Sequence, residues 1–154
     1  MDIEVNEEPA RLVAVRRATV RMDELGAFYD SAYRAVAAAI AASDGRIAGP
    51  ALGWYRGMPT DTTDVAAGFP VEGLAAGPLG DDGVEVVDLP GGRVATARYV
   101  GSYDGLGSAW GEVEEWRAAA GVDGRGDFWE VYVTEPSPDG DPAANETLLV
   151  LPLR

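Results

Sequence analysis

The chain has 154 residues, 47% of them hydrophobic and 25% charged, and its formal net charge is −14. This composition is typical of one folded domain, and the excess of acid disfavours direct binding to nucleic acid, whose phosphates are neutralised by Lys and Arg. The sequence contains no Cys, His or Lys, which excludes disulfides, Ser-His-Asp and Cys-His catalysis, Schiff-base chemistry and the usual zinc and haem ligands. We therefore expect neither a metal nor a cofactor.

The sequence also bears on location and domain count. No apolar run approaches the roughly 18 residues that a membrane helix needs, and the acidic N-terminus is unlike a signal peptide. We expect a cytoplasmic protein that does not bind membranes. Residues 1–154 are predicted to form a single domain, since one core is usual for this length.

Two short strands are predicted at the start of the chain, and the same pattern returns later. Residues 3–5 and 11–17 resemble residues 84–86 and 93–99 in their alternation of polar and apolar side chains. The chain is therefore expected to contain an internal repeat.

A helix is predicted after each pair of strands, over about residues 23–43 and 104–120. In both segments the apolar residues recur at i, i+3, i+4 and i+7, which is typical of an amphipathic helix. The predicted N-caps are short polar residues and the predicted C-terminal stops are glycines: Asp23 and Asp104, Gly45 and Gly121.

Two further strands are predicted after each helix. The first of them is rich in aromatic residues, at about residues 50–56 and 127–133, and the second ends in Phe69-Pro70-Val71 or in Leu151-Pro152-Leu153. The order strand, strand, helix, strand, strand thus occurs twice. It predicts an α+β fold in which two helices pack against antiparallel strands.

The Gly and Pro content marks the connections between these elements. Residues 73–82 are predicted to be a linker between repeat one, about 2–72, and repeat two, about 83–154. Residues 135–145 contain three prolines and are predicted to form a loop before the last strand.

Glu130 is the first candidate functional residue, because it lies in the middle of an apolar and aromatic strand. Strand alternation places it on one face with Phe128 and Tyr132, and places Trp129 and Val131 on the other. A buried carboxylate must be paired, protonated or ready to receive a ligand, which is typical of a cation receptor or a general acid. Two alternatives stay open: Glu130 could face solvent from an edge strand, or it could pair with an arginine such as Arg98.

Aromatic residues gather in the same elements and could line a pocket around this carboxylate. Each alone is typical of core packing, but together they suit a flat or cationic organic molecule, which stacking, cation–π contacts and charge pairing can hold. The predicted ligand-binding residues are Glu130, Tyr132, Trp110, Tyr103, Tyr55, Trp54, Tyr29 and Tyr99. In the first repeat Gly53 matches Glu130, so the acid belongs to one half only.

Four short features of the chain occur together: Tyr99-Val100-Gly101-Ser102-Tyr103, Trp110, Glu130-Val131-Tyr132 and Leu151-Pro152-Leu153. In this combination the chain resembles the GyrI-like small-molecule-binding domain, which is also the effector-binding domain of some multidrug-responsive transcription activators. The resemblance covers nearly the whole chain.

The resemblance implies two βαββ repeats related by a pseudo-twofold axis, with a central ligand groove and both helices on one face of the sheet. It implies that Glu130 is the family's central acid and that Gly101 and Tyr103 are its Gly-x-Tyr motif. Members of the family bind bulky, often cationic or aromatic compounds. Some stand-alone relatives are proposed to hydrolyse strained cyclopropane-containing toxins, a form of bacterial toxin resistance, and others are implicated in protecting DNA gyrase.

The residues and the resemblance together lead to three candidate functions for the chain. The first is multidrug binding, sequestration or sensing of a hydrophobic, cationic or planar small molecule through Glu130. The second is a hydrolase of electrophilic toxins in which Glu130 is the general acid or base and Tyr132 or Tyr103 orients the substrate. The third is an acidic interaction protein that protects a partner such as gyrase, and the chain itself is expected to be a monomer or a weak homodimer.

Overall fold

The sheet contains two long segments of similar structure, each made of two consecutive strands with a kink between them. The first consists of β1 (Ile3–Glu8) and β2 (Arg11–Arg21), and the second of β7 (Val84–Leu89) and β8 (Gly92–Val100). β1 pairs with β8 and β2 pairs with β7, both antiparallel. Pro9 and Pro90 lie at the two kinks, where a residue without an N–H interrupts the ladder. The computed structural model describes residues 1–134 and 140–154.

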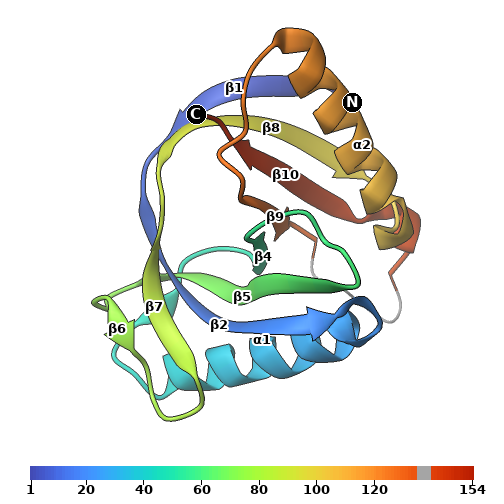
Figure 1. Cartoon of the computed structure of the whole chain (residues 1–154). Coiled ribbons are helices and arrows are strands. Elements are labelled where there is room, and N and C mark those ends of the chain that lie inside the picture. Colours follow the sequence, from blue (N-terminus) through green and yellow to red (C-terminus); the bar gives the residue numbers. More distant parts are fainter. Residues whose placement is uncertain (135–139) are drawn as a thin grey trace.

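The remaining strands, which differ in length, complete the sheet. They are β3 (Arg46–Ile47), β4 (Leu52–Tyr55), β5 (Thr62–Glu72), β6 (Gly77–Pro78), β9 (Phe128–Tyr132) and β10 (Glu146–Pro152). The strand order is β1-β8-β10-β9-β4-β5-β2-β7-β6, with β3 paired to β5. β4 and β9 therefore meet at the centre, where the two repeats adjoin. In Figure 1 the sheet curls into a C shape, with β2 and β5 on one arm and β8 and β10 on the other.

Both helices cover the same face of this sheet. α1 (Leu25–Ala41) follows β2, and α2 (Leu106–Ala120) follows β8. Figure 1 shows α1 against the arm that contains β2 and β5, and α2 beside β8 and β10. No helix in the described part of the chain is long and apolar enough to cross a membrane.

Strand alternation divides the core between the two faces. Val13 packs with Leu52, Trp129 and Val150 on the face without helices. The next residue, Ala14, packs instead with the buried α1 residues Val36 and Ile40, and Leu149, next to Val150, packs with the α2 residues Ala109 and Val113. Successive residues of a strand point to opposite faces, so both faces of the sheet are buried.

Apart from the additional two-residue strands β3 and β6, the expected order of strands and helices is confirmed, and so is Gly121 as the end of the second helix. Gly121 is the C-cap of α2 and has φ of 68°, a left-handed conformation that glycine adopts without strain. Gly45 was wrong as the stop of the first helix, because α1 ends at Ala41 with Ala42 as its cap.

The predicted N-caps were also wrong. Short 3-10 turns, η1 (Met22–Glu24) and η2 (Tyr103–Gly105), precede α1 and α2 and contain Asp23 and Asp104. The helices begin after these turns, and neither has a side-chain cap. Asp23 instead accepts a hydrogen bond from Arg21 at 2.8 Å.

The connections differ from the expectation in detail. β6 lies within the predicted linker at residues 73–82 and pairs with β7. Of the loop expected at 135–145, residues 135–139 lie outside the described residues, and the remainder contains a 3-10 turn, η3 (Pro142–Ala144).

Candidate functional site

Glu130 lies at the centre of the molecule and is only 5% exposed. β9, which carries it, has β10 on one side and β4 on the other, so the alternative of an edge strand is wrong. The alternative of pairing with Arg98 is also wrong, because Arg98 lies 3.7 Å from Glu146 instead. The hydrogen bond from Trp110 places Glu130 on the face that carries the helices, while Trp129 packs on the other face.

Two neutral side chains hold the carboxylate of Glu130. The Trp110 indole Nε1 of α2 donates to Oε2 at 2.8 Å, and the Tyr132 hydroxyl donates to Oε1 at 2.6 Å. Burial raises the pKa of Glu130 above its ordinary value, and these two hydrogen bonds oppose that rise because they favour the charged form. The carboxylate is therefore buried and hydrogen-bonded, but no positive charge neutralises it among the ion pairs of the described residues.

Tyrosines from the first repeat extend this network. The Tyr132 hydroxyl oxygen lies 3.3 Å from that of Tyr29 in α1, and Tyr29 is in turn hydrogen-bonded to the hydroxyl of Tyr55 in β4. Burial raises the pKa of Tyr55 to about 12, and it raises the pKa of Tyr29 and of Tyr132 well above the ordinary tyrosine value. All three phenols therefore remain protonated and able to donate at neutral pH.

Aromatic rings surround the carboxylate. Phe128 packs against Trp110 with ring centroids 4.7 Å apart and stacks on Tyr55 at 5.1 Å. Tyr103, in η2, meets Tyr132 edge to face at 5.8 Å and is 39% exposed, so it lies on the solvent side. We call this group the Glu130 cluster: Glu130, Tyr29, Tyr55, Tyr103, Trp110, Phe128 and Tyr132.

Gly53 provides space for this arrangement. Gly53, which the repeat matched with Glu130, is also its direct cross-strand partner in the β4–β9 ladder. A Cβ atom at Gly53 would overlap the Tyr29 hydroxyl and lie 3.1 Å from the Tyr132 hydroxyl. The absence of a side chain in the first repeat thus lets phenols from α1 and β9 meet above β4.

Trp54 and Tyr99 are candidates that the structure does not bring to Glu130. Trp54 points to the opposite face of the sheet, where its ring meets Trp129 edge to face and its Nε1 donates to Asp127 at 2.8 Å. Tyr99 donates to the carbonyl oxygen of Ser102 at 2.8 Å and packs against the backbone of η2. It supports the turn that carries Tyr103.

Two aromatic residues near Glu130 were not predicted as site residues from the sequence. Phe128 is in the cluster, and its position two residues before Glu130 on one strand face was a usable signal. Tyr33 stacks on Tyr29 with ring centroids 5.5 Å apart, and it donates to the carbonyl oxygen of Leu52 at 3.0 Å. Its position one helical turn after Tyr29 was the corresponding signal.

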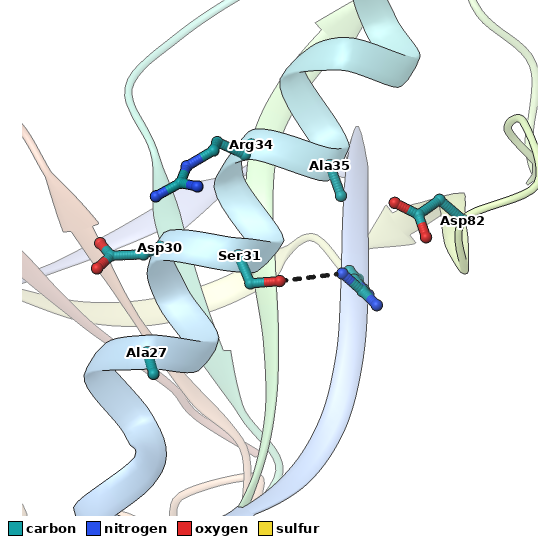
Figure 2. Close-up of a pocket in the computed structure, with 7 residues that line it drawn as sticks. Ala27, Asp30, Ser31, Arg34, Ala35 and Asp82 are labelled. Atoms are coloured by element: carbon teal, nitrogen blue, oxygen red, sulfur yellow. Dashed lines mark hydrogen bonds between the residues drawn. The ribbon is translucent and has the colours of Figure 1, made fainter.

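The described surface cavities lie away from Glu130. One, of about 550 Å³, lies on the flank of α1, where Arg16 donates to the Ser31 hydroxyl at 3.3 Å. In Figure 2, Asp30 and Arg34 extend to the other side of the helix from Ser31, so the polar groups do not converge on one point. A second cavity, of about 450 Å³, lies beside α2 and is lined in part by Tyr99 and Glu112.

The Glu130 cluster itself is filled by its own side chains. The carboxylate, the indole N–H and the hydroxyls of Tyr29, Tyr55 and Tyr132 bond to one another, and the rings of the cluster pack at centroid distances of 4.7 to 6.1 Å. A molecule that reaches Glu130 must therefore displace a ring, and Tyr103 is the most exposed large side chain of the cluster.

The chemistry of the cluster does not suit a metal ion. Glu130 is its single carboxylate, and within residues 1–134 and 140–154 no three acidic residues gather to hold a metal. A single anionic oxygen pair among aromatic rings suits an organic cation, which the ring faces and the carboxylate attract together.

The sequence matches the family described as GyrI-like small molecule binding domain over residues 1–154. No curated protein matches it.

Solved structures share the fold at low sequence identity. The C-terminal domain of EcmrR is 15% identical, with a TM-score of 0.80 over 99% of this chain and 97% of that one. SAV2435 bound to tetraphenylphosphonium is 15% identical, with a TM-score of 0.68 over 100% and 94%. A structure described as a hydrolase from Listeria innocua is 14% identical, with a TM-score of 0.69 over 99% and 91%. These likenesses establish the α+β fold.

Proposed function

Since the chain belongs to the family of GyrI-like small-molecule-binding domains, we propose that it binds bulky hydrophobic compounds, cationic or planar and aromatic, at the Glu130 cluster. Glu130 is the receptor for positive charge, and the surrounding rings form the walls. Sequestration or sensing of such compounds follows from this chemistry.

One observation carries the proposal: Glu130 is buried, and its hydrogen-bond partners are neutral. A carboxylate in such a place is costly unless a positive charge compensates it, and both of its partners, Trp110 and Tyr132, are uncharged donors. A cationic ligand would supply the missing charge, so part of its binding free energy would come from relief of this cost.

The rings favour a particular kind of cation. Tyr132, Tyr103 and Trp110 offer ring faces and edges beside the carboxylate. A large delocalised cation gains cation–π and apolar contacts with them and needs no hydrogen-bond acceptor. The SAV2435 structure was solved with tetraphenylphosphonium, a cation of this type.

The test is calorimetric titration of the protein with tetraphenylphosphonium. We expect Glu130→Gln to weaken binding by about tenfold or more, which corresponds to roughly 1.4 kcal/mol. Glu115→Gln is the matched control, because Glu115 is exposed on α2 and its replacement changes the net charge equally. Equal affinities for the two variants, or no binding by the wild type of this or related lipophilic cations, would reject the proposal.

Hydrolysis of an electrophilic compound is a second candidate, supported by the raised pKa of the buried Glu130. A carboxylate with a raised pKa is a better general base near neutral pH, and Tyr132 and Tyr103 lie beside it to orient a substrate. Mass spectrometry after incubation with a cyclopropane-bearing toxin should show addition of water with the wild type and not with Glu130→Gln. An unchanged toxin in the presence of excess protein would reject this substrate class.

A further inference from the structure

Thr147, in β10, has a buried hydroxyl without a partner. The residue is fully buried, yet its Oγ1 atom makes no hydrogen bond to any residue that the structure describes. Most buried hydroxyls in folded proteins do have a partner, because burial removes the hydrogen bonds that water would otherwise make. The Thr147 hydroxyl is therefore available to a molecule that enters beside it.

The strand register places Thr147 beside Tyr132. The two residues are directly opposite each other in the ladder between β10 and β9, so their side chains lie on the same face of the sheet. The backbone N–H of Tyr132 donates to Ala51, on the other side of β9, at 2.9 Å. Tyr132 and Thr147 therefore form a pair without backbone hydrogen bonds between them, in which the Cα atoms lie about 4.5 Å apart and the side chains are closest.

Glu130 is within reach of the same entering molecule. Its direct partner in β10 is Leu149, two residues after Thr147, so Thr147 and Glu130 are diagonal neighbours on the face that carries the helices. Diagonal neighbours lie about 7–8 Å apart, a separation that a group of a few atoms can bridge. One polar group of a ligand can therefore bond to the carboxylate and to the Thr147 hydroxyl together.

Tyr103 lies on the side of Tyr132 where Thr147 is found. β10 lies between β8 and β9, and η2, which carries Tyr103, directly follows β8. Just before η2, the backbone N–H of Gly101 donates to Asn145, two residues before Thr147, at 2.9 Å. Tyr103 thus approaches the Tyr132 ring from the side of β8, across the start of β10. A molecule that displaces the exposed Tyr103 ring would lie against Thr147 as well as beside the carboxylate.

From this geometry we infer that Thr147 makes the site selective for cations that carry N–H groups, such as a guanidinium or amidinium group on an aromatic body. A guanidinium has N–H groups on several nitrogens, so one can donate to the Glu130 carboxylate and another to Thr147 Oγ1. A cation without N–H groups uses only the charge of the carboxylate and the ring faces. The inference rests on the proposed function, because Thr147 acts on a cation that has reached Glu130.

Thr63 provides a matched control. It is the other buried threonine whose hydroxyl has no partner in the described part of the chain. It lies in β5, four residues from Ala67, which is in register with Glu130 through Gly53. Four residues along the strand and two strands across place Thr63 about 16 Å from Glu130. Thr63→Val therefore makes the same chemical change away from the carboxylate.

The first measurement is thermal unfolding of unliganded Thr147→Val, in which a methyl group replaces the hydroxyl. Because this hydroxyl has no partner to lose, we expect the melting temperature to equal or exceed that of the wild type, as for Thr63→Val. A clear fall in the melting temperature of Thr147→Val would show that the hydroxyl is already bonded in the unliganded protein, and it would overturn the inference.

The second measurement is calorimetric titration with N,N′-diphenylguanidinium and with tetraphenylphosphonium at neutral pH, where both are cations. We expect Thr147→Val to weaken binding of the guanidinium by about tenfold and to leave binding of the phosphonium unchanged. Thr147→Ser keeps a hydroxyl and should retain most of the affinity for the guanidinium, and Thr63→Val should change neither affinity. Equal effects of Thr147→Val on both cations, or no effect on either, would contradict the inference.

The same titrations distinguish this inference from the proposed function. If the wild type binds neither cation, the proposed function is rejected, and the inference with it. If the wild type binds both cations and Glu130→Gln weakens both, but Thr147→Val does not discriminate between them, the inference alone is rejected and the binding function stands.

Discussion

β4 and β9 lie side by side at the centre of the sheet, and their matching positions carry different chemistry. Gly53 is opposite Glu130, while each strand has a tyrosine two residues further on, Tyr55 and Tyr132. Two acids at the directly opposed positions would place their Cβ atoms about 5 Å apart in a buried site, where like charges repel. The comparison shows how a repeated scaffold can hold one charge: one repeat supplies the acid, and the other supplies the space and part of the hydrogen-bond network.

The helices differ in the same way. Tyr29 and Trp110 are each four residues after the first residue of their helix, and both point to the central strands. Trp110 donates directly to the carboxylate, whereas Tyr29 reaches it only through Tyr132. Equivalent positions therefore differ in how directly they act on Glu130.

Filling the space at Gly53, in the first repeat, should lower the stability of the protein more than any other change considered. Gly53→Ala places a methyl group against the Tyr29 hydroxyl, and we expect it to lower the free energy of unfolding by about 3 kcal/mol, at the upper end of the usual cost of overpacking. Urea denaturation measures this. Gly107→Ala in α2 is the control, since its new methyl group meets no atom within 4 Å and should be neutral or slightly stabilising. A fully tolerated Gly53→Ala would show that the phenols do not need this space.

Removing one hydrogen-bond donor from each helix should show that α1 and α2 contribute differently to stability. Trp110→Phe removes a hydrogen bond to a charged group, and we expect a loss of about 2 kcal/mol in the free energy of unfolding at neutral pH. Tyr29→Phe removes bonds between neutral hydroxyls, so its loss should be nearer about 1 kcal/mol. Denaturation of both variants in parallel tests this order, and a larger loss in Tyr29→Phe would contradict it.

Much of this site could be predicted from the strand pattern. Alternation along residues 128–132 was enough to place Phe128, Glu130 and Tyr132 together, and the repeat was enough to match Gly53 with the acid, whereas their pairing across β4 and β9 is a finding of the structure. The same alternation separates Trp54 from Tyr55, since neighbours on a strand cannot share a face. Whether Trp54 or Tyr55 points toward the helices depends on the register between β4 and β9, and local sequence does not determine that register.

Other features depended on contacts between distant segments. Tyr99 resembled a pocket residue, but its hydroxyl lies against Gly105 and bonds to Ser102, so it fixes η2 in place. Asp23 and Asp104 resembled N-caps, but both lie within a 3-10 turn that comes before each helix, and neither helix has a side-chain cap. The helix propensity of the sequence indicates that a helix starts nearby, but packing determines the residue at which it begins.

The smallest expected effect is the dependence of stability on pH. Because burial raises the pKa of Glu130 above 4.5, the folded protein binds this proton more tightly than the unfolded chain does. The contribution of Glu130 to the free energy of unfolding should therefore fall as pH rises from about 4.5 to the raised pKa, and stay constant above it.

Denaturation of the wild type and of Glu130→Gln across this pH range isolates the contribution. The wild type should lose stability relative to the variant as pH rises. A constant difference for Glu130→Gln would show that Glu130 has the same pKa in the folded and unfolded chain.

A crystal structure of the complex with tetraphenylphosphonium would show whether the Glu130 cluster receives a lipophilic cation. We expect the phosphonium to displace the Tyr103 ring and to lie beside the Glu130 carboxylate, with Trp110 and Tyr132 in contact with its phenyl groups. A cation bound elsewhere, for example beside Asp30 on the flank of α1, with the Glu130 cluster still closed, would contradict it.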